Sequence, residues 1–130
     1  MANRSALERA RASQVAAAGQ GFDWPTNDDP ALWAKLDEEI AELRAATNAA
    51  ERQEELGDLL FMAVNIARHL HVDAEAALAA AIDKFERRFA YVMAGADLPP
   101  MGDPQRLDAM EVRWQQAKHV VRLWTDKDQS

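Results

Sequence analysis

The sequence predicts an all-α protein, a bundle of four to five helices, and three observations support this prediction. Apolar residues recur at spacings of three and four, which is the period of an amphipathic helix; the clearest run is Leu78, Ile82, Phe85, Phe89 and Val92. Capping residues precede the periodic segments, and glycine or proline stands at several of their borders. Almost no segment shows the alternation that is typical of a β-strand.

Each expected helix has its own boundary signals. Ser5 and Glu8 form a capping-box pattern that opens the first helix, and Gly19 and Gly21 are suited to end it. Pro30 fits the first turn of the second helix, where its missing N–H costs nothing. The later helices are expected over 28–46, 49–70 and 73–93 and, after a connection at 94–104, along Leu107, Met110, Trp114, Ala117, Val121 and Trp124.

Length and composition restrict the class of protein. A chain of 130 residues fits one domain, 1–130, with one core. Its 22 acidic and 15 basic residues give a net charge of −7, which argues against a basic surface that binds nucleic acid. The absence of cysteine suits a cytoplasmic protein, and no apolar run approaches the length of a membrane span.

Two glutamates stand out on the second expected helix. At about 100° of rotation per residue, Glu39 and Glu42 fall roughly 60° and 120° from the core position Leu36, on one flank of the apolar stripe. Glu38 points away from the core. Because Glu39 and Glu42 are three residues apart, their carboxylates repel each other unless a cation lies between them.

The third expected helix repeats this arrangement with Glu55 and Asp58. Both lie on the flank away from the apolar positions Leu56, Leu60, Ala63 and Ala67, so the two acidic pairs can face each other. Hard oxygen ligands of this kind suit Mg²⁺, with Mn²⁺ as a possible substitute. The alternative is that these acids are ordinary solvated helix faces.

Residues 59–67 are apolar around nearly the whole helix, apart from Asn65. Such a helix is expected to be central or to lie at a subunit interface, which favours a homodimer or a higher oligomer. Asn65 needs a hydrogen-bond partner, which is either the substrate or a neighbouring helix. Gly57, inside the same helix, suggests the close approach of another element.

The order of these acids resembles a known signature. The segment EEIAE at 38–42, followed after twelve residues by ELGD at 55–58, resembles the EExxE…ExxD pattern of the all-α nucleoside triphosphate pyrophosphohydrolase superfamily. Further segments resemble the C-terminal domain of MazG proteins, at 5–7, 21–25, 57–61, 65–70, 84–89 and 114–116.

This resemblance implies hydrolysis of nucleoside triphosphates to the monophosphate and pyrophosphate, with broad specificity and a house-cleaning role in the nucleotide pool. It implies that Glu39, Glu42, Glu55 and Asp58 hold Mg²⁺ and that one glutamate, not identified, takes a proton from water. Glu38 belongs to the same catalytic motif but is expected near the surface. The alternatives are a catalytically silent dimerisation or regulatory module, and a narrower substrate such as dUTP, dCTP, a damaged nucleotide or phosphoribosyl-ATP.

Four further side chains are candidates for substrate binding. Lys84 and Arg88 lie on one flank of the fourth expected helix, where they either contact phosphates or cover the edge of the core. Phe22 and Trp24, in the loop before Pro25, either form a wall against the nucleobase or anchor the loop.

The sequence departs from the family pattern at one position. Glu51 stands where MazG proteins often have a lysine, so a basic contact with the substrate is in doubt. Arg52 is the nearest replacement and is expected to project towards the core.

Overall fold

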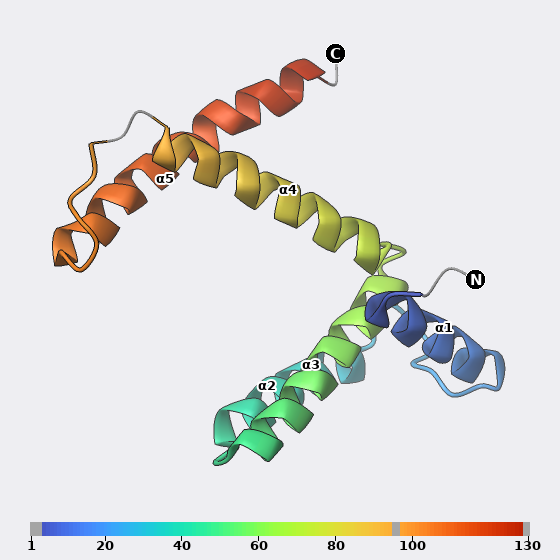
Figure 1. The fold of residues 1–130 in the computed structure, drawn as a ribbon. Helices are drawn as coiled ribbons and strands as arrows, with labels where there is room; N and C mark the ends of the chain where they lie inside the picture. The colour runs from blue at the N-terminus through green and yellow to red at the C-terminus, as the bar shows by residue number, and fades with distance from the viewer. Residues whose placement is uncertain (1–3, 95–96, 129–130) are drawn as a thin grey trace. The chain divides into compact units, whose positions relative to one another are not determined.

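The computed structural model describes residues 4–94 and 97–128, with side chains described as far as residue 120. All regular structure in these residues is helical, in the order α1 (Ala6–Gly19), α2 (Pro30–Ala45), α3 (Ala49–His69), α4 (Ala74–Met93) and α5 (Pro104–Asp128) (Figure 1). The all-α prediction is confirmed. The expected apolar positions Val121 and Trp124 lie outside the described side chains, and no helix in the described part is long and apolar enough to cross a membrane.

Side-chain caps explain why the helices begin where the sequence predicted. A side-chain oxygen just before each helix accepts a backbone N–H from its first turn, at 2.8 to 3.1 Å. The capping residues are Ser5, Asp29, Asn48, Asp73 and Asp103. Pro30 occupies the start of α2, as expected.

Helices α1 and α3 end with the same backbone hydrogen bonds but with different residues at the critical position. The N–H of Phe22 reaches the carbonyl of Ala17, and the N–H of Val72 reaches that of Ala67, which closes a Schellman motif in both cases. This motif needs a left-handed residue just before the one that donates. At the end of α1 that residue is Gly21, with φ of 90°, but at the end of α3 it is His71, with φ of 59°.

We therefore expect His71→Gly to raise the free energy of unfolding by up to about 1 kcal/mol, since the left-handed conformation costs a non-glycine residue about 1–2 kcal/mol and glycine's extra chain entropy offsets part of that gain. Urea denaturation measures the change. His71→Val should be destabilising, because a β-branched residue tolerates this conformation least. Equal stability of the two variants would contradict the prediction.

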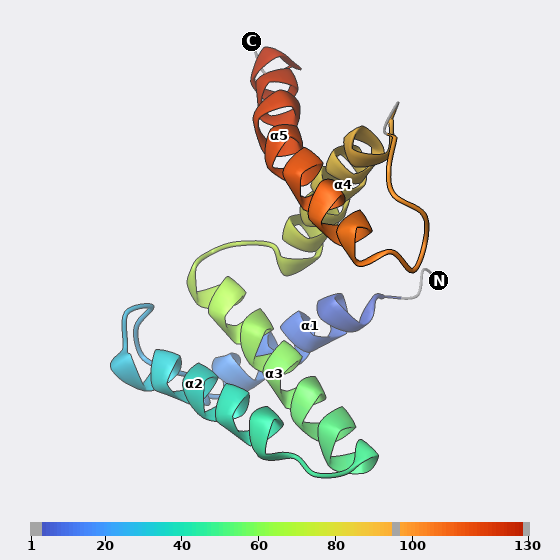
Figure 2. The same cartoon turned by 90° about the vertical axis from the view of Figure 1, so that its left-hand side faces the viewer.

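The chain forms two compact units, residues 1–77 and 78–130, and each is described by itself. In the first unit, α2 and α3 run side by side and antiparallel, and α1 lies against α3 (Figure 2). The Gln14 side chain of α1 donates to the carbonyl of Phe61 on α3 at 2.9 Å. Leu32, Met62 and Val64 are the buried apolar residues of this unit.

One face of α3 differs from the prediction. The positions expected in the core are exposed within the first unit: Leu56 is 46% exposed, Leu60 is 53% exposed and Ala63 is also exposed. The reason is that α2 lies against the opposite side of α3, the side that carries Glu55. A helix that is apolar nearly all round has two faces to cover, and this unit covers one of them.

The close approach expected at Gly57 is not found within the first unit. A Cβ atom added at this glycine would meet no atom of another element within 4 Å. Gly57 therefore does not mark a close approach within the first unit.

In the second unit, α4 and α5 contact each other through large side chains. Val92 and Ala117 are buried, and Phe85 lies 5.5 Å from Trp114 between ring centroids. Arg113 of α5 donates to three carbonyl oxygens at the end of α4, at 2.8 to 2.9 Å, so it satisfies groups that the helix leaves without partners. Of the stripe predicted for the α4 core, only Val92 is buried; the exposed members are Leu78, Ile82, Phe85 and Phe89.

Candidate functional site

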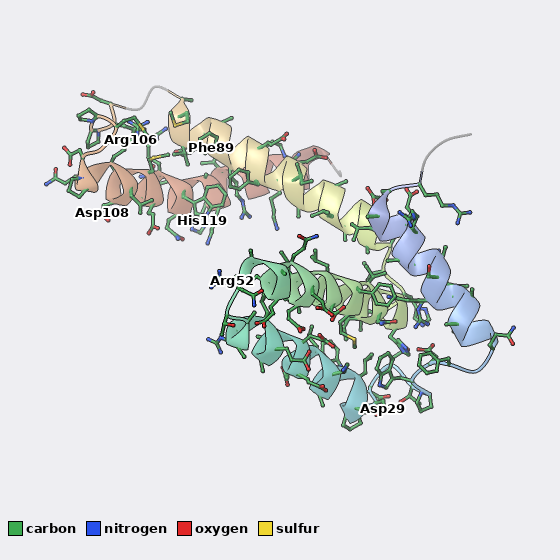
Figure 3. The ribbon with its side chains drawn as sticks, turned by 60° about the horizontal axis from the view of Figure 1, so that its bottom comes forward. Asp29, Arg52, Phe89, Arg106, Asp108 and His119 are labelled. Atoms are coloured by element: carbon green, nitrogen blue, oxygen red, sulfur yellow. The ribbon has the colours of Figure 1, made fainter. Side chains whose placement is uncertain are left out.

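Three glutamates meet where α2 faces α3. Glu39 and Glu42 lie one turn apart on α2, and Glu55 faces them from α3, with one carboxylate oxygen of each residue within 4.8 Å of the others. Side-chain oxygens gather between these two helices in Figure 3, which labels Asp29 and Arg52 at opposite ends of the helix pair. The three-residue spacing on α2 therefore turns both glutamates towards the same neighbour, as the helical period predicted.

The environment of this cluster is costly for negative charge. Glu39 is 6% exposed, and one carboxylate oxygen of Glu39 and one of Glu55 are buried without a hydrogen-bond partner. Burial, the charge of Glu39 and the neighbouring Glu55 raise the pKa of Glu42 to about 7. Orphaned, converging carboxylate oxygens fit a divalent cation such as Mg²⁺ or Mn²⁺, which binds hard oxygen ligands and removes the repulsion.

The other two acids of the motif lie at the edge of this cluster. Asp58 is exposed and lies outside the group of three, but it lines the same cavity as Glu39. Glu38 is exposed, as expected, and pairs with Lys35 at 3.3 Å. The structure therefore brings three of the four predicted ligands together and leaves Asp58 beside them.

Lys35 is a site residue that the sequence analysis missed. Its Nζ atom lies 3.2 Å from the carboxylate of Glu39. Hydrogen bonds to Glu39 and, to a smaller extent, to Glu38 raise the pKa of Lys35. Lys35 thus balances part of the negative charge of the cluster. The signal was present in the sequence, because a lysine four residues before Glu39 lies on the same side of the helix.

A cavity of about 640 Å³ opens beside the cluster. Its walls come from α1, the loop before α2, α2 itself and α3, and they include Lys35, Glu39 and Asp58. Trp24, half-buried, and Phe22, 83% exposed, also line it, so both predicted aromatic wall residues are at this cavity. Its size suits a small organic ligand.

The loop that carries these aromatics is attached to α3 by Asp23. The Asp23 carboxylate accepts two hydrogen bonds from Arg68, at 2.7 and 2.8 Å, and one from His69 at 2.8 Å. The Arg68 guanidinium holds the pKa of Asp23 well below its usual range. Arg68 also donates to the buried Asn65 at 3.2 Å, so the partner that Asn65 was expected to need lies one turn along its own helix.

Sequence reasoning missed Asp23 and Arg68 because 45 positions separate them, and no local spacing relates residues that far apart.

The two predicted phosphate contacts belong to the second unit. Lys84 is exposed on α4. Arg88 is half-buried, with its guanidinium 5.7 Å from the centre of the Trp114 ring, so its stem covers the packing between α4 and α5. Their contact with phosphate stays a prediction.

Residues 51 and 52 have structural explanations. The Glu51 carboxylate accepts the N–H and the hydroxyl of Thr47, at 2.9 and 3.2 Å, and so closes the turn before α3. Arg52 is exposed, so the expectation that it projects towards the core is wrong. Arg52 lies in the first turn of α3, where no other helix of the first unit packs over its side chain.

The fold and the cluster define an all-α protein with a carboxylate site suited to a divalent cation. Residues 29–93, half of the chain, match the MazG nucleotide pyrophosphohydrolase domain. The chain is 44% identical over 119 residues to the nucleoside triphosphate pyrophosphohydrolase of Escherichia coli K12, covering 87% of this chain and 44% of that protein. It is 46% identical over 84 residues to the nucleoside triphosphate pyrophosphohydrolase/pyrophosphatase MazG of Thermotoga maritima, covering 65% and 32%.

The chain therefore belongs to the MazG nucleotide pyrophosphohydrolase domain family. It spans less than half the length of these relatives.

The raised pKa of Glu42 predicts opposite pH dependences with and without a cation. Without metal, the folded state holds this proton more tightly than the unfolded state, so the group's contribution to stability is present below pH 4.5 and is lost as pH rises through about 7. Mg²⁺ binds the ionised form. We therefore expect Mg²⁺ to raise the Tm more at pH 8 than at pH 6.

Differential scanning calorimetry checks this, with Glu42→Gln and the exposed control Asp37→Asn. Glu42→Gln should raise the metal-free Tm at pH 8 and reduce the effect of Mg²⁺, whereas Asp37→Asn should behave as the unchanged protein does. A Mg²⁺ effect of the same size at both pH values would show that Glu42 does not control binding.

Proposed function

We propose that this protein hydrolyses nucleoside triphosphates to nucleoside monophosphates and pyrophosphate, with Mg²⁺ as its cation. The observation that carries the proposal is the group of three glutamates with orphaned buried oxygens, placed beside a cavity with aromatic walls. The names of the relatives, which are nucleoside triphosphate pyrophosphohydrolases, support the same reaction.

In the proposed reaction, the oxygen of water forms a bond to the α-phosphorus, and the bond from that phosphorus to the bridging oxygen breaks. Glu39, Glu42 and Glu55 hold the cation, and Asp58 completes the set from the cavity edge. The bound cation supplies charge neutralisation of the triphosphate and a lowered pKa for water. A carboxylate of the cluster accepts the proton that water loses.

In this proposal the phosphates lie beside Lys35 and Glu39, which line the cavity. The Lys35 ammonium, 3.2 Å from the carboxylate of Glu39, would supply positive charge to a phosphate oxygen beside the cluster. We also propose that Lys84 and Arg88, on α4, bind phosphate groups of the substrate. Residues 1–130 would then act as one functional domain.

The base lies against the aromatic wall of Phe22 and Trp24. Stacking on an aromatic face tolerates every base, because each base has a π-face. This supports broad specificity for ribo- and deoxyribonucleotides. We further propose a house-cleaning role in the cytoplasmic nucleotide pool.

The exposed apolar face of α3, defined by Leu56, Leu60 and Ala63, supports a homodimer. This face lies on the side of α3 opposite Glu55 and α2, so α2 leaves it open to a second copy. Exposed apolar surface of this kind on a central helix is typical of an interface.

Glu39→Gln is expected to lower the turnover of nucleoside triphosphates at least about 100-fold, because it removes a charged ligand from the cation site. The measurement incubates a panel of ribo- and deoxyribonucleoside triphosphates with and without Mg²⁺ and separates the products. Monophosphate and pyrophosphate should form only with the cation, and the exposed control Asp37→Asn should keep its activity.

Three outcomes would refute this function. Formation of diphosphate and phosphate would show that the bond to the γ-phosphorus, and not the bond to the α-phosphorus, is cleaved. Activity that survives a chelator would show that no cation is required. No turnover of any triphosphate would favour a silent dimerisation module.

Sedimentation velocity tests the proposed dimer. The protein should sediment as a dimer at micromolar concentration, and Leu60→Glu should shift it to the monomer by placing a charge on the covered face. Met101→Glu, the same type of change at an exposed position in the α4–α5 connection, is the control and should stay dimeric. A monomeric unchanged protein would exclude the proposal.

A further inference from the structure

One carboxylate, that of Asp23, fixes the loop between α1 and α2 to the body of the first unit. It accepts hydrogen bonds from both terminal nitrogens of Arg68, from Nε2 of His69 and from the backbone N–H of Trp24, at 2.7 to 2.9 Å. The partners are held firmly, since the side chain of Arg68 is 15% exposed and that of His69 is 6% exposed. A largely buried ion pair between Asp23 and Arg68 therefore connects the loop to α3.

These contacts are concentrated on one of the two carboxylate oxygens of Asp23. Oδ1 accepts from one terminal nitrogen of Arg68, from Nε2 of His69 and from the N–H of Trp24, and Oδ2 accepts from the other terminal nitrogen of Arg68. The carboxylate accepts only, so His69 must donate from Nε2, which fixes its tautomer. Asp23 lines the cavity, and three of its four hydrogen bonds go to Arg68 and His69 of α3, so we expect it to act on a ligand through the neighbours that it fixes.

Two neighbours that line the cavity depend on Asp23. Trp24 is held on both sides, because its N–H bonds to Asp23 and its ring meets the buried His69 ring edge-on, with centroids 6.2 Å apart. Arg68, oriented by Asp23, donates to the amide oxygen of Asn65. The amide nitrogen of Asn65 has one long contact, 3.9 Å to the sulfur of Met62, so it keeps its capacity to donate to a ligand.

We propose that Asp23 is a positioning residue for the nucleobase: through Arg68 and His69 it holds Trp24 as a fixed stacking wall and turns the Asn65 amide towards the base. This inference rests on the proposed nucleotide hydrolysis, which it deepens by separating the grip on the base from the chemistry at the phosphates. The glutamate cluster holds the triphosphate end, and the Asp23 group holds the base end.

The test uses three variants of the full chain. Asp23→Ala removes the carboxylate, and Asp23→Asn keeps the shape and one acceptor oxygen, which guards against a variant that fails to fold because Arg68 is left unpaired. Asp28→Ala is the matched control, since it removes the same charge from an exposed residue of the same loop. Each is compared with the unchanged protein in four measurements.

The measurements are kcat and KM for a nucleoside triphosphate, the Kd of its non-hydrolysable α,β-methylene analogue, the Tm increase with Mg²⁺, and backbone hydrogen exchange over 21–25. Asp23→Ala should raise KM and Kd by roughly tenfold or more, as the loss of a base–aromatic stack does, while kcat changes less than about threefold. The Tm increase with Mg²⁺ should be unchanged, and backbone hydrogen exchange over 21–25 should be faster. Asp23→Asn should show a smaller change in the same direction, and Asp28→Ala none.

Three results would overturn the inference. An unchanged Kd in Asp23→Ala would show that the wall does not depend on this carboxylate, and equal losses in kcat, Kd and the Mg²⁺ effect would show a general structural role. Unchanged backbone hydrogen exchange over 21–25 in Asp23→Ala would show that Asp23 does not anchor the loop. Failure of the proposed function can be told apart from failure of this inference. In the first case the unchanged protein turns over no triphosphate, but hydrogen exchange over 21–25 still shows whether Asp23 anchors the loop.

Discussion

Mutual repulsion among three carboxylates, enclosed between two helices, is the constraint on which the rest of the site depends. Glu39 and Glu55 each bury an oxygen that no protein group satisfies, and burying a charge without full compensation costs several kcal/mol. Lys35 supplies partial compensation from the solvent side. Helix α1 and the 21–29 loop build a cavity against the same helices, so these uncompensated charges border a space of the size of a small ligand.

The sequence predicted the parts of this structure that local geometry controls. Helix starts follow from caps within three residues, as at Ser5 and Asn48, and the inward direction of Glu39 and Glu42 follows from the 3.6-residue period. The same reasoning chose the wrong face of α3, because a helix with apolar residues nearly all round offers no unique direction. Only the position of α2 decides that Leu60 is exposed within this unit.

The rest of the site depends on contacts between distant positions. Asp23 and Arg68 are unremarkable in a loop and at a helix end, and their importance arises from the ion pair that the packing of α1 and α3 creates. Phe22 and Trp24 were recognised as candidates because aromatics in a turn need a partner, but nothing local distinguished the fixed Trp24 from the exposed Phe22. The anchor also explains how an irregular loop can form a wall as defined as one made by a helix.

The short connection between α2 and α3 has a consequence for folding. Residues 46–48 alone join the two helices, so Glu39 and Glu55 approach through a contact between positions only sixteen apart in the chain. Closing so small a loop carries little entropic cost, and contacts of this kind form early. We therefore expect the helix hairpin, together with any cation that joins its two arms, to act as a folding nucleus onto which the loop and α1 dock later.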